Sequence, residues 1–196
     1  MMTTGTTVGD SAAADRIRRA AIEAFAESGY AGSSTRQITR RLNMSATAMY
    51  PHFRSKEDLL YAIALDGHRA VLAALRDADD PASPVLDRLT SVVSAFATWQ
   101  AEFHQLARVV QYELAALTPV HYRTITAMRR DTVAVVAAIV QAGKDSGEFS
   151  VDDVDDVVLA ISSLCVDVCR WFPSKIHDDP RRLGVAYGRI AQRLVR

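Results

Sequence analysis

The chain has 196 residues, of which 49% are hydrophobic and 23% charged, and its formal net charge is zero. This composition excludes a disordered or fibrous protein and indicates one or two globular domains with a substantial core. No apolar run approaches the roughly 20 residues that a membrane-spanning helix needs, and the N-terminus lacks a basic stretch followed by an apolar one. We therefore expect a cytoplasmic protein without membrane partners, whose residues 1–10 form a disordered tail.

The charged residues are distributed unevenly along the chain. The segment from Ser33 to Lys56 contains five basic residues and no acidic one, whereas Asp145 to Asp156 contains six acidic residues and no basic one. A local field of one sign attracts a polyanion even where the global charge is zero. The basic segment is therefore a candidate nucleic-acid surface, with a solvated basic face as the simpler alternative.

Two helices are expected near the N-terminus. Apolar residues at helical spacing predict the first over residues 12–28, with Gly29 as its stop. Ser33 or Ser34 can cap the second, over residues 35–42. Asn43 then tolerates the left-handed conformation that a helix end requires.

A third, short helix is predicted to begin at Ser45 and to end at Pro51. Because a helix of this length is unstable alone, its role depends on how it is held, and Met49 and Phe53 are the expected anchors. Ser55 then starts a long helix to about Arg76. The further predicted helices span residues 84–101, 103–117, 119–146, 152–172 and 180–195, which makes an all-α chain of about nine helices.

Residues 35–52 have the pattern of a helix-turn-helix, whose exposed second helix fits the major groove of DNA. Small residues at the start of that helix, Ser45, Ala46 and Thr47, let the backbone approach the bases, and Thr47 can hydrogen-bond a base edge. The groups expected to hold phosphates are Thr35, Tyr50, His52 and Lys56. Arg36 reaches far enough for a guanine, although a phosphate partner or solvent fits equally well.

Residues 17–63, "IRRAAIEAFAESGYAGSSTRQITRRLNMSATAMYPHFRSKEDLLYAI", resemble the DNA-binding domain of the TetR family of bacterial transcriptional regulators. The segments "AFAESGY", "STRQI", "MYPHF" and "SKEDLL" match in order and spacing. The resemblance implies a helix-turn-helix DNA-binding domain at residues 11–54 and a ligand-binding and dimerisation domain at residues 55–196, with helix 55–76 linking the two. Asn43 and Met44 depart from the family pattern, which has Gly and a small β-branched residue there.

The resemblance also implies roles for individual residues. Phosphate contacts fall to Thr35, Tyr50, His52 and Lys56, and the residues nearest the bases are Arg36, Ser45, Ala46 and Thr47. The implied partners are an inverted-repeat operator in double-stranded DNA, a second copy of the chain and a small-molecule effector, and repression is the implied mode of regulation.

Two segments of the body, "TVAVVAAIVQAG" and "VVLAISSLCVDVCRWF", are apolar nearly all round, as expected where a partner subunit covers one face. The predicted two-fold interface comprises Val158, Ile161, Cys165, Val168, Leu183, Tyr187, Ile190 and Leu194. The core of a monomer is the alternative explanation for this apolarity.

The many apolar residues of the body can also line a ligand cavity between the helices. The apolar candidates are Phe96, Trp99, Phe103, Val110, Met128, Val135 and Leu164, and the polar ones are His104, Arg108, Gln111, Tyr112 and Tyr122. The segments "FHQLARVVQYEL", "AGKDSGEF" and "CRWF" are similar to regulators of lipid and steroid catabolism that sense acyl-CoA thioesters. This ranks a lipophilic acid or its CoA ester first as ligand and a hydrophobic drug-like compound second. Arg108 or Arg170 can meet the phosphate or carboxylate of such a ligand, with a surface salt bridge as the simpler alternative for either.

No catalytic residues, metal site or cofactor are predicted, because the chain has no G-x-S-x-G, phosphate-loop or H-E-x-x-H motif. Cys165 and Cys169 are expected to be buried reduced thiols, since a soft-metal site would need another ligand, for which His177 is the candidate. The alternatives to a regulator are a dimeric helical protein with a degenerate DNA-binding head and an enzyme acting on acyl-CoA.

Overall fold

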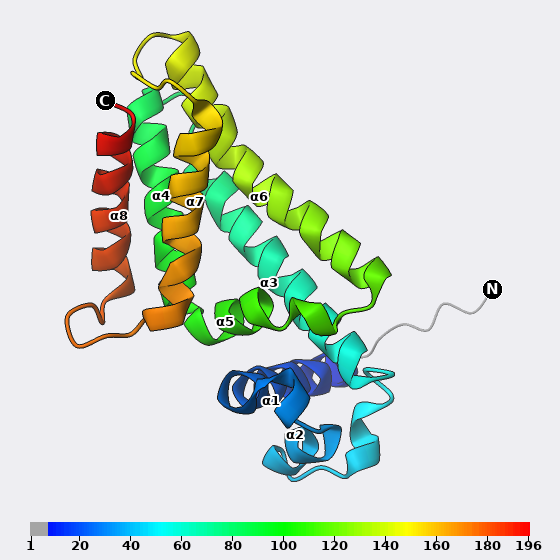
Figure 1. The fold of residues 1–196 in the computed structure, drawn as a ribbon. Helices are drawn as coiled ribbons and strands as arrows, with labels where there is room; N and C mark the ends of the chain where they lie inside the picture. The colour runs from blue at the N-terminus through cyan, green and yellow to red at the C-terminus, as the bar shows by residue number, and fades with distance from the viewer. Residues whose placement is uncertain (1–7) are drawn as a thin grey trace.

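The computed structural model describes residues 8–196, and its regular structure is entirely helical (Figure 1). The elements are α1 (Val8–Gly32), α2 (Thr35–Arg41), the 3₁₀ turn η1 (Ala46–Met49), α3 (Lys56–Ala78), α4 (Val85–Glu102), α5 (His104–Tyr112), the 3₁₀ turn η2 (Leu114–Ala116), α6 (Pro119–Asp145), α7 (Val154–Trp171) and α8 (Pro180–Leu194). The all-α prediction is confirmed. The expected tail lies outside the described residues as far as residue 7, and residues 8–10 already belong to α1.

Figure 1 shows a small head built from α1, α2 and η1, and a larger body above it. Helix α3 starts in the head and runs up into the body beside the long helix α6. Helix α5 lies across the junction, where it packs against both α1 and α7, and α8 packs along α4. No helix in residues 8–196 combines the length and the apolarity needed to cross a membrane.

The head has its own hydrophobic core, and that core continues into α5, η2 and the start of α6. Ile17, Ile38 and Leu60 lie in one buried cluster with Val110 and Ile125. The core therefore runs across the domain boundary predicted at residues 54/55. As a result the head rests on α5 and α6 as well as on the linking helix α3.

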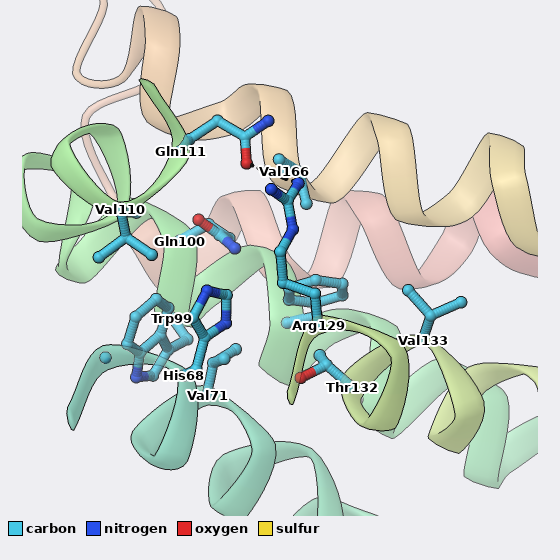
Figure 2. Close-up of a pocket in the computed structure, with 13 residues that line it drawn as sticks. His68, Val71, Trp99, Gln100, Val110, Gln111, Arg129, Thr132, Val133 and Val166 are labelled. Carbon is cyan, nitrogen blue, oxygen red and sulfur yellow. Dashed lines mark hydrogen bonds between the residues drawn. The ribbon is translucent and has the colours of Figure 1, made fainter. Parts of the chain in front are cut away.

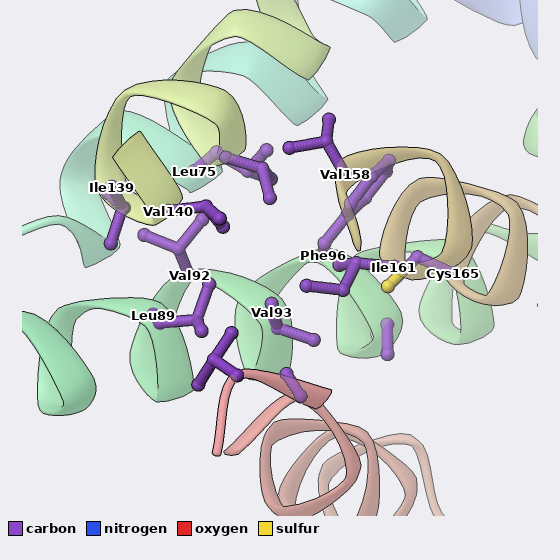
Figure 3. Close-up of a cluster of buried hydrophobic side chains, with 14 of the residues drawn as sticks. Leu75, Leu89, Val92, Val93, Phe96, Ile139, Val140, Val158, Ile161 and Cys165 are labelled. Atoms are coloured by element: carbon purple, nitrogen blue, oxygen red, sulfur yellow. The ribbon is translucent and has the colours of Figure 1, made fainter. Parts of the chain in front are cut away.

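The core of the body is a separate cluster formed by α3, α4, α6, α7 and α8 (Figure 3). Phe96, Ile161 and Cys165 are fully buried in it, with Cys169 close by. Both cysteines are free, as predicted, and burial raises the pKa of the Cys165 thiol and raises that of Cys169 to about 11. Because thiolates are the reactive form of cysteine, these two side chains act as apolar packing groups.

Candidate DNA-binding edge and ligand cavity

The first turn of α2 is held by a reciprocal pair of hydrogen bonds. The backbone N–H of Gln37 donates to Ser34 Oγ at 3.2 Å, and the backbone N–H of Ser34 donates to Gln37 Oε1 at 2.7 Å. This is a capping box, with Ser34 rather than Ser33 as the capping residue. It fixes the start of α2, where the Arg36 side chain is exposed and Thr35 is partly exposed.

The turn after α2 takes the backbone conformation expected from the sequence. Asn43 has φ 54°, in the left-handed region, and its N–H donates to Arg40 O at 3.1 Å. The N–H of Met44 then donates to Thr39 O at 3.0 Å. Asn is, after Gly, the residue that best tolerates this conformation, so Asn43 serves in place of the glycine usual in the family pattern.

The reading element is a single 3₁₀ turn, not the short α-helix predicted from residue 45 to Pro51. The N–H of Ala48 donates to Ser45 O at 3.0 Å and that of Tyr50 to Thr47 O at 3.2 Å, which are bonds to the third residue back. Too few residues lie before Pro51 to offset the cost of nucleating an α-helix.

As predicted, Met49 and Phe53 anchor the reading element. Met49 is fully buried and Phe53 nearly so, both in the head core. Tyr50, Thr47 and Ser45 are exposed, and the hydroxyl oxygens of Ser45 and Thr47 lie 3.0 Å apart. The anchored face thus leaves two hydroxyl groups and a phenol available on the outside of the head.

Lys56, a predicted phosphate contact, is already tied to the protein in this structure. Its Nζ donates to the carbonyl oxygens of Tyr30 and Ser33, each at 2.7 Å, and lies 4.0 Å from the centre of the Tyr30 ring. Burial lowers the pKa of the Lys56 ammonium. The side chain therefore clamps the start of α3 to the turn between α1 and α2, which sets the position of both helix starts at the edge of the head.

The basic side chains of the head fall into two groups. Arg41 is paired with Glu27 and lies 3.6 Å from Glu23, so it braces α2 against α1. The exposed residues Arg36, Arg40 and Arg54 make no ion pair within residues 8–196. These three cations are therefore free to interact with phosphates.

A hydrogen-bonded cluster that the sequence did not predict joins the head to α6. Glu57 Oε1, in the first turn of α3, accepts from Thr118 N at 2.8 Å and lies 2.9 Å from His121 Nδ1. The His121 ring stacks on Tyr61 with 3.7 Å between the ring centres. These residues are too far apart in the sequence for any local pattern to signal the contact.

Asp58 completes a group with Glu57 and His121 whose potential metal-ligand atoms lie within 4.8 Å of one another. The His121 imidazole and the backbone N–H of Thr118 already satisfy Glu57 in this cluster. We therefore interpret the group as a junction between head and body.

A cavity of about 90 Å³ lies inside the body, between α3, α4, α5, α6 and α7 (Figure 2). Its lining consists of Gly67, His68, Val71, Phe96, Trp99, Gln100, Ala107, Val110, Gln111, Arg129, Thr132, Val133 and Val166. Four of the sequence candidates for ligand binding are in this lining, namely Phe96, Trp99, Val110 and Gln111. His68, Gln100 and Arg129 were not predicted, because nothing in the local sequence indicates that α3 and α6 turn them toward the same space.

The cavity lining includes polar side chains that are partly or fully buried, among them His68, Gln100 and Arg129. His68 Nε2 is sealed from solvent and has no hydrogen-bond partner within the described residues. Burial, with a smaller contribution from the nearby Arg129 charge, lowers the pKa of His68 to about 4, so its ring is neutral near pH 7. The Arg129 guanidinium donates to Gln111 Oε1 at 3.0 Å, and Gln100 is buried.

The other predicted ligand residues lie outside the lining of this cavity. Arg108 donates to the carbonyl oxygens of Cys169 and Arg170, at 3.3 and 3.1 Å, and so ties α5 to the end of α7. Arg170 itself pairs with Asp167 at 2.7 Å. The remaining side chains outside the lining are the exposed Phe103, Tyr112, Tyr122 and Leu164 and the partly exposed His104, Met128 and Val135.

The predicted dimer residues occupy two different environments. Val158, Ile161, Cys165, Val168 and Leu183 are buried within one subunit, and Tyr187 is partly buried. Ile190 and Leu194 are exposed, and so are Leu159 and Leu164 on α7 and Val185 on α8. A side chain buried in its own subunit offers no surface to a partner, so only the exposed group is free to form an interface.

A head with a helix-turn-helix, joined to a larger helical body that contains a cavity, defines a DNA-binding regulator of the helix-turn-helix class. Residues 17–63 match the family described as bacterial regulatory proteins, tetR family. Residues 82–195 match the one described as tetracyclin repressor-like, C-terminal domain. The chain therefore belongs to the TetR family of transcriptional regulators.

Three known proteins illustrate the similarity. The crystal structure of a bacterial regulatory protein in the tetR family from Rhodococcus RHA1 is 49% identical, with a TM-score of 0.90 and coverage of 93% of this chain and 96% of that one. The fatty acid metabolism regulator protein of Bacillus subtilis is 25% identical over 68% of this chain and 69% of its own length. The structure of AibR in complex with isovaleryl coenzyme A and operator DNA is 17% identical, covers 93% of this chain and 98% of its own, and shares the fold at a TM-score of 0.82.

Proposed function

We propose that this regulator is a dimeric repressor that binds a palindromic operator and is released from it by a small lipophilic ligand, a lipophilic acid or its CoA thioester. The observation that carries the proposal is the continuity between the cavity and the head. Val110 of α5 lines the cavity and also belongs to the buried core of the head. A ligand that displaces Val110 therefore acts directly on the packing that orients the head.

The DNA contacts keep their predicted roles in this proposal. Thr35, Tyr50, His52 and Lys56 hold phosphates, and Arg36, Ser45, Ala46 and Thr47 lie nearest the bases. The exposure of Thr47, Tyr50 and Arg36 supports their availability to DNA. Because base contacts carry the specificity, Thr47→Val is expected to change the preferred half-site.

The dimer is proposed to form through the exposed apolar side chains of α7 and α8. Each subunit then presents one head, and a two-fold dimer reads an inverted repeat whose half-sites lie roughly one helical turn apart. The family match supports this arrangement, since the matched C-terminal region includes both helices.

The ligand class is supported by the relatives and by the cavity. One relative is named for fatty acid metabolism, and one solved structure holds isovaleryl coenzyme A. At about 90 Å³, the cavity is smaller than the roughly 150 Å³ that holds a benzene molecule, so a ligand has to widen it by moving helices. Such a ligand shifts the protein toward a second conformation by its differential affinity for the two states.

The experiment that tests the proposal begins with selection of bound sites from a pool of random DNA duplexes. The expected result is an enriched inverted repeat, which then serves as a fluorescent probe in titrations with acyl-CoA thioesters of increasing chain length. Release of the probe by one of them supports the ligand-responsive repressor. Absence of enrichment by a folded dimer contradicts operator binding and indicates a degenerate head.

A further inference from the structure

We infer that the cavity binds an amphipathic anion, whose charge pairs with Arg129 and whose apolar part packs against Phe96 and Trp99. This inference rests on the proposed function, because it takes the cavity as the effector site, and it adds the residue that recognises the charge of the ligand. It follows from three features: a partly buried cation that makes no ion pair within residues 8–196, a buried histidine nitrogen without a hydrogen-bond partner in the same range, and two residues shared by the cavity and an outer groove.

The cation is the guanidinium of Arg129, on the cavity side of α6. It is partly buried, and its hydrogen bond goes to the neutral amide of Gln111. None of the ion pairs formed within residues 8–196 includes Arg129. Removal of a charge from water is unfavourable unless an opposite charge or several hydrogen bonds compensate it. An anion beside Arg129 supplies that compensation.

The neutral groups lie close enough to share the same ligand. Figure 2 shows His68, Gln100, Gln111 and Arg129 directed toward one space, with Trp99 and Val71 on its apolar side. His68 Nε2 is buried without a partner, and Gln111 uses its carbonyl oxygen for Arg129. The Gln111 amide N–H groups and the neutral His68 ring can therefore hydrogen-bond a carboxylate or carbonyl oxygen of the ligand.

The cavity adjoins an outer groove at Arg129. Arg129 and Val133 line both the cavity and a groove on the outer face of α6, where Tyr122, Thr126 and Arg130 are the neighbouring residues. These two side chains thus form the wall between inside and outside. A free carboxylic acid fits with its carboxylate at this wall. An acyl thioester has no charge at its carbonyl group, and its phosphates lie beyond the long pantetheine arm, so it offers no anion to Arg129 at this wall.

The apolar part of the ligand is expected to be short, because the cavity volume is about 90 Å³. Hexanoate is a suitable first probe, with hexanol as its uncharged counterpart and hexanoyl-CoA as the thioester. Direct calorimetric titration of the full-length protein in the absence of DNA measures binding independently of repression. Arg129→Gln removes the proposed anion partner, whereas Arg130→Gln removes the neighbouring charge that faces only the groove.

The expected result is that hexanoate binds at least tenfold more tightly than hexanol, and that Arg129→Gln removes this preference. Arg129→Lys should retain part of it, because the charge remains. Hexanoate binding should be unchanged in Arg130→Gln, whereas hexanoyl-CoA that binds more tightly than hexanoate and loses affinity in Arg130→Gln would make the thioester the ligand and overturn the pairing with Arg129. Three other results would overturn the inference: hexanol that binds as tightly as both anions, an Arg129→Gln variant with unchanged affinity for hexanoate, or no binding of any probe at millimolar concentration.

Two further outcomes separate this inference from the proposed function. If Arg129→Gln fails to fold, the comparison of hexanoate with hexanol on the unmodified protein still decides the question. If the anion binds but leaves operator affinity unchanged, the anion site stands and the proposed release mechanism fails. If an uncharged lipophile releases the operator in a manner independent of Arg129, the mechanism stands and the anion site fails.

Discussion

His68 makes the stability of the protein depend on pH in a defined window. Its pKa is lowered to about 4 in the folded chain, against about 6.5 for a histidine in an unfolded chain. Between these two pKa values the unfolded state binds a proton that the folded state does not. The contribution of His68 to the free energy of unfolding is therefore fully present above about pH 6.5 and is lost as the pH falls toward about 4. The expected loss between pH 7 and pH 5 is about 2 kcal/mol from this residue.

Urea unfolding at a series of pH values, at fixed protein concentration, measures this effect. His68→Leu replaces the titrating ring by an apolar side chain of similar size. The loss of stability between pH 7 and pH 5 should therefore be about 2 kcal/mol smaller in this variant than in the unmodified protein. Equal pH dependence in both proteins would show that the ring is hydrated in solution. The positive charge that faces the ring, Arg129, is unchanged in this comparison.

Lys56 is expected to contribute to the stability of the head as well as to DNA affinity. In Lys56→Met, the carbonyl oxygens of Tyr30 and Ser33 lose their charged donor, and such bonds contribute about 1 to 3 kcal/mol each. Thermal unfolding should show a lower Tm, and operator affinity should fall alike for all DNA sequences. For the thermal unfolding, Arg54→Met is the matched control, because Arg54 is exposed and free of ion pairs within residues 8–196.

The salt dependence of DNA binding distinguishes the two roles of Lys56. Loss of one phosphate contact reduces the slope of log affinity against log salt by about one. An unchanged slope together with a lower Tm assigns Lys56 to the clamp alone. An unchanged Tm would contradict the clamp.

At the scale of helices, α8 lies unusually close to α4 because two glycines face it. A Cβ added at Gly184 would lie 2.1 Å from Thr98 Oγ1 and 2.6 Å from the backbone oxygen of Ser94. Thr98 can rotate, but the carbonyl group of Ser94 cannot move without α4. Gly184→Ala should therefore destabilise the fold by about 1 to 3 kcal/mol, measured by urea unfolding. Gly32→Ala, whose Cβ has 3.5 Å to its nearest neighbour, should stay within about 0.5 kcal/mol.

Helix ends were predictable to within a few residues because they are set by local chemistry. The left-handed residues Gly29 and Asn43, with φ 71° and 54°, and the capping residues Ser34 and Ser55 lie where the sequence places them. The predicted helix over 103–117 is divided instead, since α5 ends at Tyr112 and a 3₁₀ turn follows. No glycine or proline marks that division.

Placement of side chains between helices was far less predictable. His68 and Arg129 meet in the cavity only because α3 and α6 pack together, and their separation in the sequence conceals the contact. The same holds for Glu57 and His121. Because apolar residues lie on every side of α7, the sequence did not indicate which side faces the subunit's own core. Ile161 is fully buried there, whereas Leu159 is exposed.

For the whole molecule, two connections between cavity and head follow from the packing. Helix α3 begins in the head at Lys56 and carries His68 in the cavity wall. Helix α5 is the second connection, since Leu106 packs against both hydrophobic cores. A ligand that widens the cavity displaces both helices, so the orientation of the head depends on the contents of the body.

The two heads of the proposed dimer act together only if the subunits are joined at a fixed spacing, so the exposed face of α7 and α8 provides the last test. Leu159, exposed by 66%, is the most accessible large aliphatic side chain on α7. Leu159→Asp places a buried charge in each half of a two-fold interface and should weaken dimerisation about 100-fold. Ile176→Asp is the control, because Ile176 is 80% exposed in the connection between the two helices.

Sedimentation velocity over a range of protein concentrations measures the dimer, and fluorescence anisotropy measures binding to an inverted repeat and to a single half-site. Leu159→Asp should sediment as a monomer where the unmodified protein is a dimer, and should lose affinity for the inverted repeat while affinity for the half-site stays the same. The half-site measurement shows that the head is intact, because Leu159 lies in the body, on α7. A Leu159→Asp protein that remains fully dimeric would place the interface on another surface, and with it a different spacing between the heads.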